Sequence, residues 1–371
     1  MVRLHFIDNL RWIAILLLFP THAAFVFCAG WYSYYVLSPY SSVAAHCFTV
    51  AIEPWIMPLL FCIAGISTTF ALQKRTSLAY LKERAERLLV PFLAGMVLVC
   101  PVIAYFALKF HTGYEGSYAG AVVHFFSSAS AFPNTNGMVG EFSVDHLWFL
   151  LFLFIISLAA LCLIHLWQRL FGSRFNSIVI PLPVLLVLFV PAWFLNAAGP
   201  NVAGYSLLSY LLFFLIGYAL IASDDVQESL EENWALLVAV WIVLTIGVMW
   251  IGGIVLGHWE LFWGSSPVFV LTGWTGALAL LGAGRHLLNF SNAVTTYLSA
   301  ASYPVYIIHH AVLVAVAYYL IAVPVPPGVQ YMLIVLLSLL MTFACYEIIR
   351  RIPVVRVLFG IAGQKKEEEP A

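Results

Sequence analysis

The sequence is short of charged residues. Asp, Glu, Lys and Arg make up only 9% of its 371 residues, whereas soluble domains contain about 25%. So few charged side chains cannot cover a water-exposed surface. Hydrophobic residues reach 63%, and the mean hydropathy is +0.98. The composition therefore excludes a soluble protein and indicates an all-α bundle that crosses a lipid bilayer many times.

Motifs of common soluble enzymes are also missing. The sequence contains no Walker A loop, no GxGxxG, no GxSxG and no HExxH. A net charge of −1 and the absence of a basic domain argue against a nucleic-acid partner. Function must therefore come from polar residues placed inside apolar segments.

Cysteine forms no metal-binding pattern. The six Cys are scattered without ligand spacing, so we expect no metal site. Cys28 and Cys47 flank the first predicted outside loop and could form a disulfide. The favoured interpretation is that all six are packed apolar residues.

Apolar runs near the ~20 residues that a bilayer core requires recur along the whole chain. We predict ten spans, at 8–28, 48–72, 88–110, 146–166, 178–197, 205–222, 234–254, 266–283, 297–320 and 330–349. Prolines interrupt the fifth and small residues fill the eighth, and neighbouring helices can satisfy the backbone at such breaks. The first segment has charged residues and no small-residue cleavage site, so we expect an uncleaved span.

Basic residues predict the orientation. All but one of the 16 Lys and Arg fall at the N-terminus, in alternate loops or in the C-terminal tail, and the exception is Lys109. The positive-inside rule makes that basic side cytoplasmic, and an even number of spans places both termini there. We expect one membrane domain over 1–360 and a charged, disordered cytoplasmic tail over 361–371.

The first span, in RWIAILLLFPTH, has a cation at one end and an imidazole at the other. Eleven residues at about 100° each bring Arg11 and His22 to within ~20° of one helix face, about 16 Å apart along the axis. Asp8 can pair with Arg11 at i+3. On spacing alone, Arg11 could snorkel and His22 could bond a neighbouring helix, or both could be functional, as costly intramembrane groups often are.

The stretch KERAERLLVP places Arg84 and Arg87 at i and i+3. Glu83 can pair with Arg87, and taken alone the pattern favours a salt-bridged, solvated helix. The alternative is a phosphate site, for which Arg is well suited.

Two other segments carry polar groups into spans. DHLWFLLFLF begins with Asp145 and His146, and ASYPVYIIHHAVL contains Tyr306, His309 and His310. Tyr306 reaches both histidines at i+3 and i+4, and we expect the two rings to point ~100° apart, in different roles. A lone His on an apolar helix is more often a packing group than a catalyst.

Together these stretches resemble the acyltransferase 3 family of integral membrane acyltransferases, and within it the periplasmic-glucan succinyltransferase branch. The resemblance covers nearly the whole chain, in order. It comprises IDNLRWIAILLLFPTH, MPLLFCIAG, RAER, HLWFL, ASYPVYIIHH and YEIIRRIPVVRVLFG. One departure is Ala64 before Gly65, where the family usually has Ser-Gly.

The resemblance implies an enzyme that transfers an acyl group, other than an amino-acyl group, from cytoplasmic acyl-CoA to a hydroxyl of an extracytoplasmic carbohydrate. The family's essential pair falls on Arg11 and His22, its Arg-x-x-Arg on Arg84 and Arg87, and its late Tyr-x-x-His on Tyr306 and His309. A bacterial inner membrane, a cell-envelope glycan as acceptor and no permanently bound cofactor follow from the same resemblance. The hydrolase-like domain of some members is missing, so we expect the bundle to handle the acceptor.

The chemistry of the residues fits that expectation. Acyl transfer to a hydroxyl needs a base near neutral pH, and His22 suits it. The donor's phosphates need Arg at the cytoplasmic rim, where Asp8 would orient Arg11. Direct transfer and an acyl-His intermediate both stay open.

Two other classes of function stay open beside it. One is a haem-binding electron carrier using His22, His146, His309 and His310, which does not explain Arg84 and Arg87. The other is a transporter or flippase with Arg11 and His22 along its pathway.

The longest connection, His111 to Asp145, is predicted to lie outside the membrane. Its composition suits a sugar, with aromatic faces and hydrogen-bonding groups at Tyr114, Tyr118, Phe125, Phe126, Phe132, Asn134, Asn136, Glu141 and Asp145. The alternative is an interfacial helix whose aromatic residues rest on the bilayer surface.

Overall fold

The computed structural model describes residues 4–132, 134–172, 180–202, 204–262, 264 and 266–361. Helices make up nearly all regular structure there. In those ranges the one sheet is an antiparallel ribbon of β1 (Asn201–Val202) and β2 (Tyr205–Ser206), in which Asn201 pairs with Ser206 and Val202 with Tyr205.

The α-helices are α1 (His5–Phe25), α2 (Val43–Lys74), α3 (Ser77–Arg84), α4 (Val90–Leu98), α5 (Cys100–Thr112), α6 (Tyr118–Ser127), α7 (Trp148–Phe171), α8 (Leu182–Val187), α9 (Phe189–Ala198), α10 (Leu207–Ile216), α11 (Asp224–Glu232), α12 (Trp234–Val248), α13 (Pro267–Leu287), α14 (Ala293–Leu320), α15 (Pro327–Ile349) and α16 (Pro353–Leu358). The π-helical segments are η1 (Ala85–Leu89), η6 (Gly217–Ile221) and η7 (Met249–Val255). The 3₁₀ segments are η2 (Ser128–Ala131), η3 (Gly137–Val139), η4 (Asp145–Leu147) and η8 (Trp259–Phe262).

Several of these helices are long enough to cross a membrane. In the described residues seven helical segments are long and apolar enough, or eight if Leu207–Ile221 and Asp224–Glu232, bent by 96°, form one span. The seven are Val43–Lys74, Ser77–Thr112, Asp145–Phe171, Trp234–Val255, Pro267–Leu287, Ala293–Leu320 and Pro327–Ile349. The chain is therefore a multi-pass helical membrane protein, as predicted, while the count of ten and the sidedness stay predictions.

Besides the sixth predicted span, which is the first part of the bent pair, two predicted spans are missing from that set for identifiable reasons. α1 has 21 residues, but polar residues such as Asp8 and Arg11 interrupt its apolar run. The fifth predicted span becomes the shorter apolar helix Leu182–Ala198, divided into α8 and α9, each with a proline in its first turn. Positions 178 and 179 of that span, and 362–371 of the predicted tail, lie outside the described residues.

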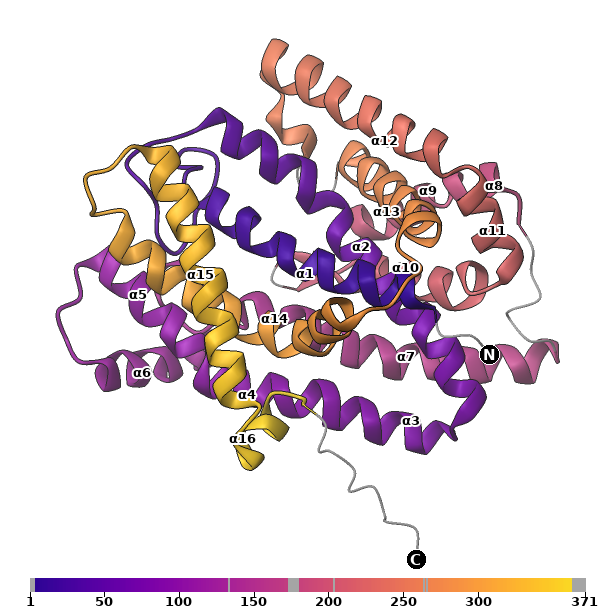
Figure 1. Ribbon diagram of the computed structural model, residues 1–371, viewed down its shortest axis with the longest axis horizontal. Helices are drawn as coiled ribbons and strands as arrows, with labels where there is room; N and C mark the ends of the chain where they lie inside the picture. The colour runs from indigo at the N-terminus through magenta and orange to yellow at the C-terminus, as the bar shows by residue number, and fades with distance from the viewer. Residues whose placement is uncertain are drawn as a thin grey trace, which may run out of the picture.

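Helix α1 lies near the centre of the bundle (Figure 1), against α2, α13, α14 and α15. By contrast α12 lies at the edge of the molecule in Figure 1, and only Leu237 and Thr245 of this helix are buried, as expected for a helix that faces lipid. The central position of α1 explains why polar groups on it meet groups from other helices rather than lipid.

Small residues let α2 and its neighbour approach closely. A Cβ on Gly65 would overlap the Phe214 backbone oxygen of α10, and one on Gly217 would overlap the Cys62 backbone oxygen. Membrane helices pack through such small residues. Gly65 is therefore required by packing, whereas Ala64 only forgoes the hydroxyl of the family's usual Ser.

All six cysteines are free, including Cys28 and Cys47. Cys28, Cys62 and Cys100 are buried, and Cys162 is exposed on α7. The favoured interpretation of packed thiols therefore holds for the three buried ones, while Cys47 and Cys345 are partly exposed and Cys162 lies on the outer surface of the bundle.

Candidate active site

Four histidine rings meet inside the bundle. The ring centroid of His22 lies 4.4 Å from that of His310 and 5.3 Å from that of His309. His146 lies 5.1 Å from His310 and 5.2 Å from His309. These residues come from α1, η4 and α14, and we call them the histidine cluster. His309 and His310 bond different partners, the Tyr306 carbonyl and the Tyr34 hydroxyl, and His22 lies within reach of both rings. Their separate roles stay a prediction.

Hydrogen bonds to the backbone fix two of these rings. His309 Nδ1 lies 2.5 Å from the Tyr306 carbonyl oxygen, and His146 Nε2 lies 2.9 Å from that of Ile307. Because a carbonyl only accepts hydrogen bonds, these nitrogens carry the protons, and the other nitrogen of each ring is an acceptor. Those two acceptors, His309 Nε2 and His146 Nδ1, are buried and have no partner in the described structure.

Contacts between η4 and α14 hold the cluster together. The Tyr306 hydroxyl of α14 donates to the His146 carbonyl oxygen of η4, and the His146 ring donates back to the Ile307 carbonyl oxygen of α14. Asp145 is the one residue other than glycine with a positive φ in the described ranges, at 43°, and its carboxylate accepts a 2.8 Å hydrogen bond from the Tyr35 hydroxyl. Such backbone conformations persist only where surrounding contacts enforce them.

His22 differs from the other three histidines. It makes no hydrogen bond to any described residue, and its Nδ1 is buried without a partner. Its side chain is partly exposed, whereas His309 is 0% and His310 3% exposed. An imidazole with both nitrogens uncommitted can take a proton from a molecule that reaches it.

A second group of polar residues lies at the N-terminal end of α1, about 16 Å along the axis from His22. Arg11 donates to Asp8 at 3.1 Å and to the Ser67 hydroxyl at 3.4 Å, and Arg84 donates to the Thr68 hydroxyl at 3.1 Å. Adjacent residues of α2 thus hold the two cations. We call this part of the bundle the arginine end.

Arg87 lies differently from Arg84. Its Nε pairs with Glu83 at 3.2 Å, and its side chain is 61% exposed. Arg84 instead lies 4.9 Å from the centroid of the Tyr80 ring and is partly buried. The π-helical segment η1 begins directly after Arg84, and the extra residue per turn changes the face on which Arg87 lies. The predicted Glu83–Arg87 pair is therefore present, and the two arginines do not act as one solvated face.

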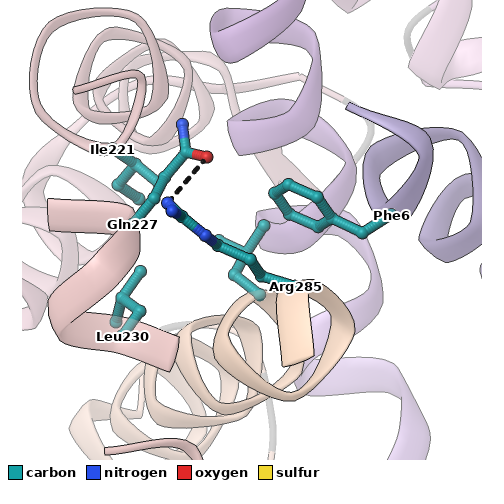
Figure 2. Close-up of a pocket in the computed structure, with 6 residues that line it drawn as sticks. Phe6, Ile221, Gln227, Leu230 and Arg285 are labelled. Atoms are coloured by element: carbon teal, nitrogen blue, oxygen red, sulfur yellow. Dashed lines mark hydrogen bonds between the residues drawn. The ribbon is translucent and has the colours of Figure 1, made fainter. Parts of the chain in front are cut away.

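A small pocket also lies near the arginine end (Figure 2). It has an empty volume of about 170 Å³ and is lined by Phe6, Ile221, Gln227, Leu230, Leu281 and Arg285. Figure 2 shows Arg285 reaching Gln227, 3.4 Å away, and the same guanidinium pairs with Glu231 at 2.8 Å. Its charge is neutralised within the protein, so Arg285 offers no unpaired cation to a ligand here.

The connection from 111 to 145 uses many of its polar groups internally. The Tyr114 hydroxyl donates to the Ser117 carbonyl, and Glu141 accepts from the Asn136 backbone N–H at 2.6 Å. Asp145 instead accepts from Tyr35, in the loop between α1 and α2. Phe125 is 0% exposed, whereas Tyr118 and Phe126 are exposed.

Sequence reasoning missed Tyr34, Tyr35 and Glu53. Tyr34 lies with its hydroxyl 2.9 Å from His310 Nε2, and nothing in the spacing of a loop tyrosine predicts that contact. Glu53 could have been found, since an acidic residue inside an apolar span is costly and often functional. Among the described residues no group of His, Cys, Asp and Glu could hold a metal ion.

Residues 4–347 match the acyltransferase 3 family model, described as an acyltransferase domain. With this match covering most of its length, the chain belongs to that family of membrane acyltransferases. It is similar to glucans biosynthesis protein C of Salmonella schwarzengrund, at 23% identity over 100% of this chain and 97% of the relative. The proteins of the same name from Salmonella typhi and Escherichia coli K12 are 24% and 22% identical, with the same coverage. No solved structure matches the chain.

Proposed function

We propose that the protein is a membrane O-acyltransferase that takes an acyl group from acyl-CoA at the arginine end and delivers it to a carbohydrate hydroxyl at the opposite end. The arginine end would face the cytoplasm of a bacterial inner membrane. The observation that carries the proposal is the placement on one face of α1 of a partly exposed, unbonded His22 and of Arg11. The relatives' name, glucans biosynthesis protein C, supports a glucan-like acceptor.

In this mechanism Arg11 and Arg84 bind donor phosphates through charge-assisted hydrogen bonds, with Arg87 at the exposed rim. Asp8 orients Arg11. The pantetheine arm of the donor spans the distance from there to the histidine cluster, so the thioester carbon reaches His22.

At the cluster, His22 accepts the proton of the acceptor hydroxyl while the hydroxyl oxygen forms a bond to the thioester carbon. The C–S bond then breaks, the electron pair leaves with sulfur, and the proton held by His22 passes to that thiolate. His309 assists as an acceptor, because Tyr306 holds its proton on Nδ1 and leaves Nε2 free. In the two-step alternative, a nitrogen of His22 bonds to the thioester carbon and coenzyme A leaves as a thiolate. The acceptor hydroxyl then attacks the acyl carbon and releases His22, while His309 Nε2 takes the hydroxyl proton and passes it to the thiolate.

Mass spectrometry of envelope glycans from cells with and without the gene tests the proposed activity. We expect one glycan class to lose a single acyl mass, such as acetyl or succinyl, when the gene is absent. Identical glycan masses in both strains would contradict the proposal.

A further inference from the structure

Glu53 is an acidic side chain inside α2 to which acyl transfer, as described above, gives no role. Its carboxylate makes no hydrogen bond or ion pair with any described residue. The residue is partly exposed, although Pro54 and Trp55 after it are buried. An unpaired carboxylate in an apolar bundle is unfavourable. A bound polar molecule would stabilise the carboxylate at this position, where the described residues supply no partner.

Tyrosines from distant segments surround this carboxylate. The pKa values of Tyr32, Tyr34 and Tyr205 are raised by burial first and by the Glu53 carboxylate second. Tyr32 and Tyr34 belong to the loop between α1 and α2, and Tyr205 belongs to β2. The packing agrees with this, because the Tyr32 hydroxyl lies 3.4 Å from that of Thr49, one turn before Glu53. Helices α2 and α10 run side by side, with the rings of Phe61 and Tyr210 4.7 Å apart, so Tyr205, which precedes α10, lies toward the Glu53 end of α2.

An aromatic platform lies just before α10, toward the Glu53 end of α2. The Tyr205 ring stacks on Trp148 with centroids 3.8 Å apart and planes 13° apart. Trp148 is buried and supports the stack, while Tyr205 and Tyr32 are partly exposed. Flat, partly exposed rings next to hydrogen-bonding groups are the combination that binds amphipathic ring ligands.

The platform connects directly to the histidine cluster. The Tyr34 hydroxyl lies 2.9 Å from His310 Nε2, and its ring stacks over His22 at 6.4 Å and 16°. Glu53 precedes Ser67 by about 21 Å along α2, so this group lies away from the arginine end. A molecule bound at Glu53 would be adjacent to His22 and distant from the donor phosphates.

Rigid packing fixes Glu53 in this place. Gly273 of α13 lies so close to α2 that a Cβ there would overlap the Pro54 backbone oxygen. One turn earlier the Thr49 hydroxyl lies 2.8 Å from the His46 carbonyl oxygen and 3.4 Å from the Tyr32 hydroxyl. The backbone around Glu53 and the loop tyrosine are thereby held together.

We propose that Glu53, Tyr32, Tyr205 and Trp148 form the subsite for a neutral sugar ring of the acceptor, an inference that rests on the proposed function. Hydroxyls of the ring donate hydrogen bonds to the Glu53 carboxylate, and an apolar face of the ring packs on Tyr205. Tyr34 is the link between this subsite and the cluster, so a neighbouring hydroxyl of the same sugar is directed to His22. The negative charge also disfavours anionic molecules at this end.

Equilibrium binding to the purified full chain tests the subsite, with a glucose oligosaccharide and free coenzyme A as separate probes. We expect Glu53→Gln to weaken oligosaccharide binding about tenfold, the size of one charge-assisted hydrogen bond, and to leave coenzyme A binding unchanged. Glu228→Gln, an exposed glutamate on α11, is the matched control and should change neither affinity. Tyr205→Leu, which removes the platform, should weaken oligosaccharide binding severalfold and serves if the first variant fails to fold.

Retained coenzyme A binding shows that a variant is folded. Unchanged oligosaccharide affinity in a folded Glu53→Gln or Tyr205→Leu variant would overturn the subsite, as would the lack of any oligosaccharide binding by the wild-type chain. A wild-type chain that binds the oligosaccharide in a Glu53-dependent way but transfers no acyl group would instead contradict the proposed function alone.

Discussion

At the scale of single residues, hydrogen bonding separates His22 from its neighbours. His146, His309 and His310 each have one nitrogen bonded to a carbonyl or to Tyr34, whereas His22 has no bond to any described residue. Rings fixed by bonds serve to shape a site, and an unbonded ring can exchange a proton with a substrate. This difference leads us to assign the base to His22.

We therefore expect His22→Ala to reduce acyl transfer about 10²–10⁴-fold, the usual contribution of a general base, while thermal unfolding stays close to wild type. His124→Ala, which removes an exposed imidazole on α6, is the matched control and should keep full activity. Transfer from labelled acyl-CoA to a glucose oligosaccharide is the measurement. Full activity of the His22 variant would contradict its assignment as the base and indicate that the ring only packs against its neighbours.

We expect Tyr306 to stabilise the fold around the histidine cluster. Its hydroxyl donates to the His146 carbonyl and ties α14 to η4, so Tyr306→Phe should lower the free energy of unfolding by about 0.5–1.5 kcal/mol. Tyr319→Phe, with an exposed ring on the same helix, should have little effect. Thermal denaturation followed by fluorescence compares the two, and equal stability would argue against the tie between η4 and α14.

At the scale of helices, α2 connects the two ends of the site. Ser67 and Thr68 hold Arg11 and Arg84, and Glu53 lies nearer the other end of the same helix. One rigid element thus sets the distance between the place where donor phosphates would bind and the place where a sugar would lie.

Arg84→Ala should weaken coenzyme A binding about tenfold or more, since a hydrogen bond to a charged group contributes about 1.5–3 kcal/mol. Arg87→Ala should weaken it less, because Arg87 already pairs with Glu83. Thr68→Val, which removes only the hydroxyl that positions Arg84, should raise the KM for acyl-CoA severalfold without changing kcat. Calorimetry and steady-state kinetics check these expectations, and unchanged affinity in all three variants would mean that the donor binds elsewhere.

Close packing of α2 against α10 gives a separate prediction. Gly65→Ala places a methyl group on the Phe214 backbone oxygen, and backbone cannot rotate away, so we expect a loss of about 1–3 kcal/mol in stability. Gly247→Ala on α12 has open space around it and should be neutral or slightly stabilising. Similar melting temperatures for the two variants would show that α2 and α10 are farther apart than the structure has them.

At the scale of the whole molecule, composition was sufficient to predict a helical membrane protein, because 9% charged residues cannot cover a water-exposed surface. Helical period was sufficient to place Arg11 and His22 on one face. The four-histidine cluster could not be predicted, since it depends on contacts between residues as far apart as His22 and His310. The position of Glu53 among loop tyrosines has the same origin, and the π-helical η1 that separates Arg84 from Arg87 leaves no simple mark in the sequence.

The most direct test of the account is transfer across a sealed membrane. Proteoliposomes would contain a glucose oligosaccharide inside and receive acetyl-CoA or succinyl-CoA, labelled in the acyl group, outside only. For chains whose arginine end faces outward, we predict that label appears on the enclosed oligosaccharide with release of free coenzyme A outside, and that His22→Ala abolishes both. Equal labelling by the His22→Ala chain, or no labelling by the wild type with either donor, would contradict it.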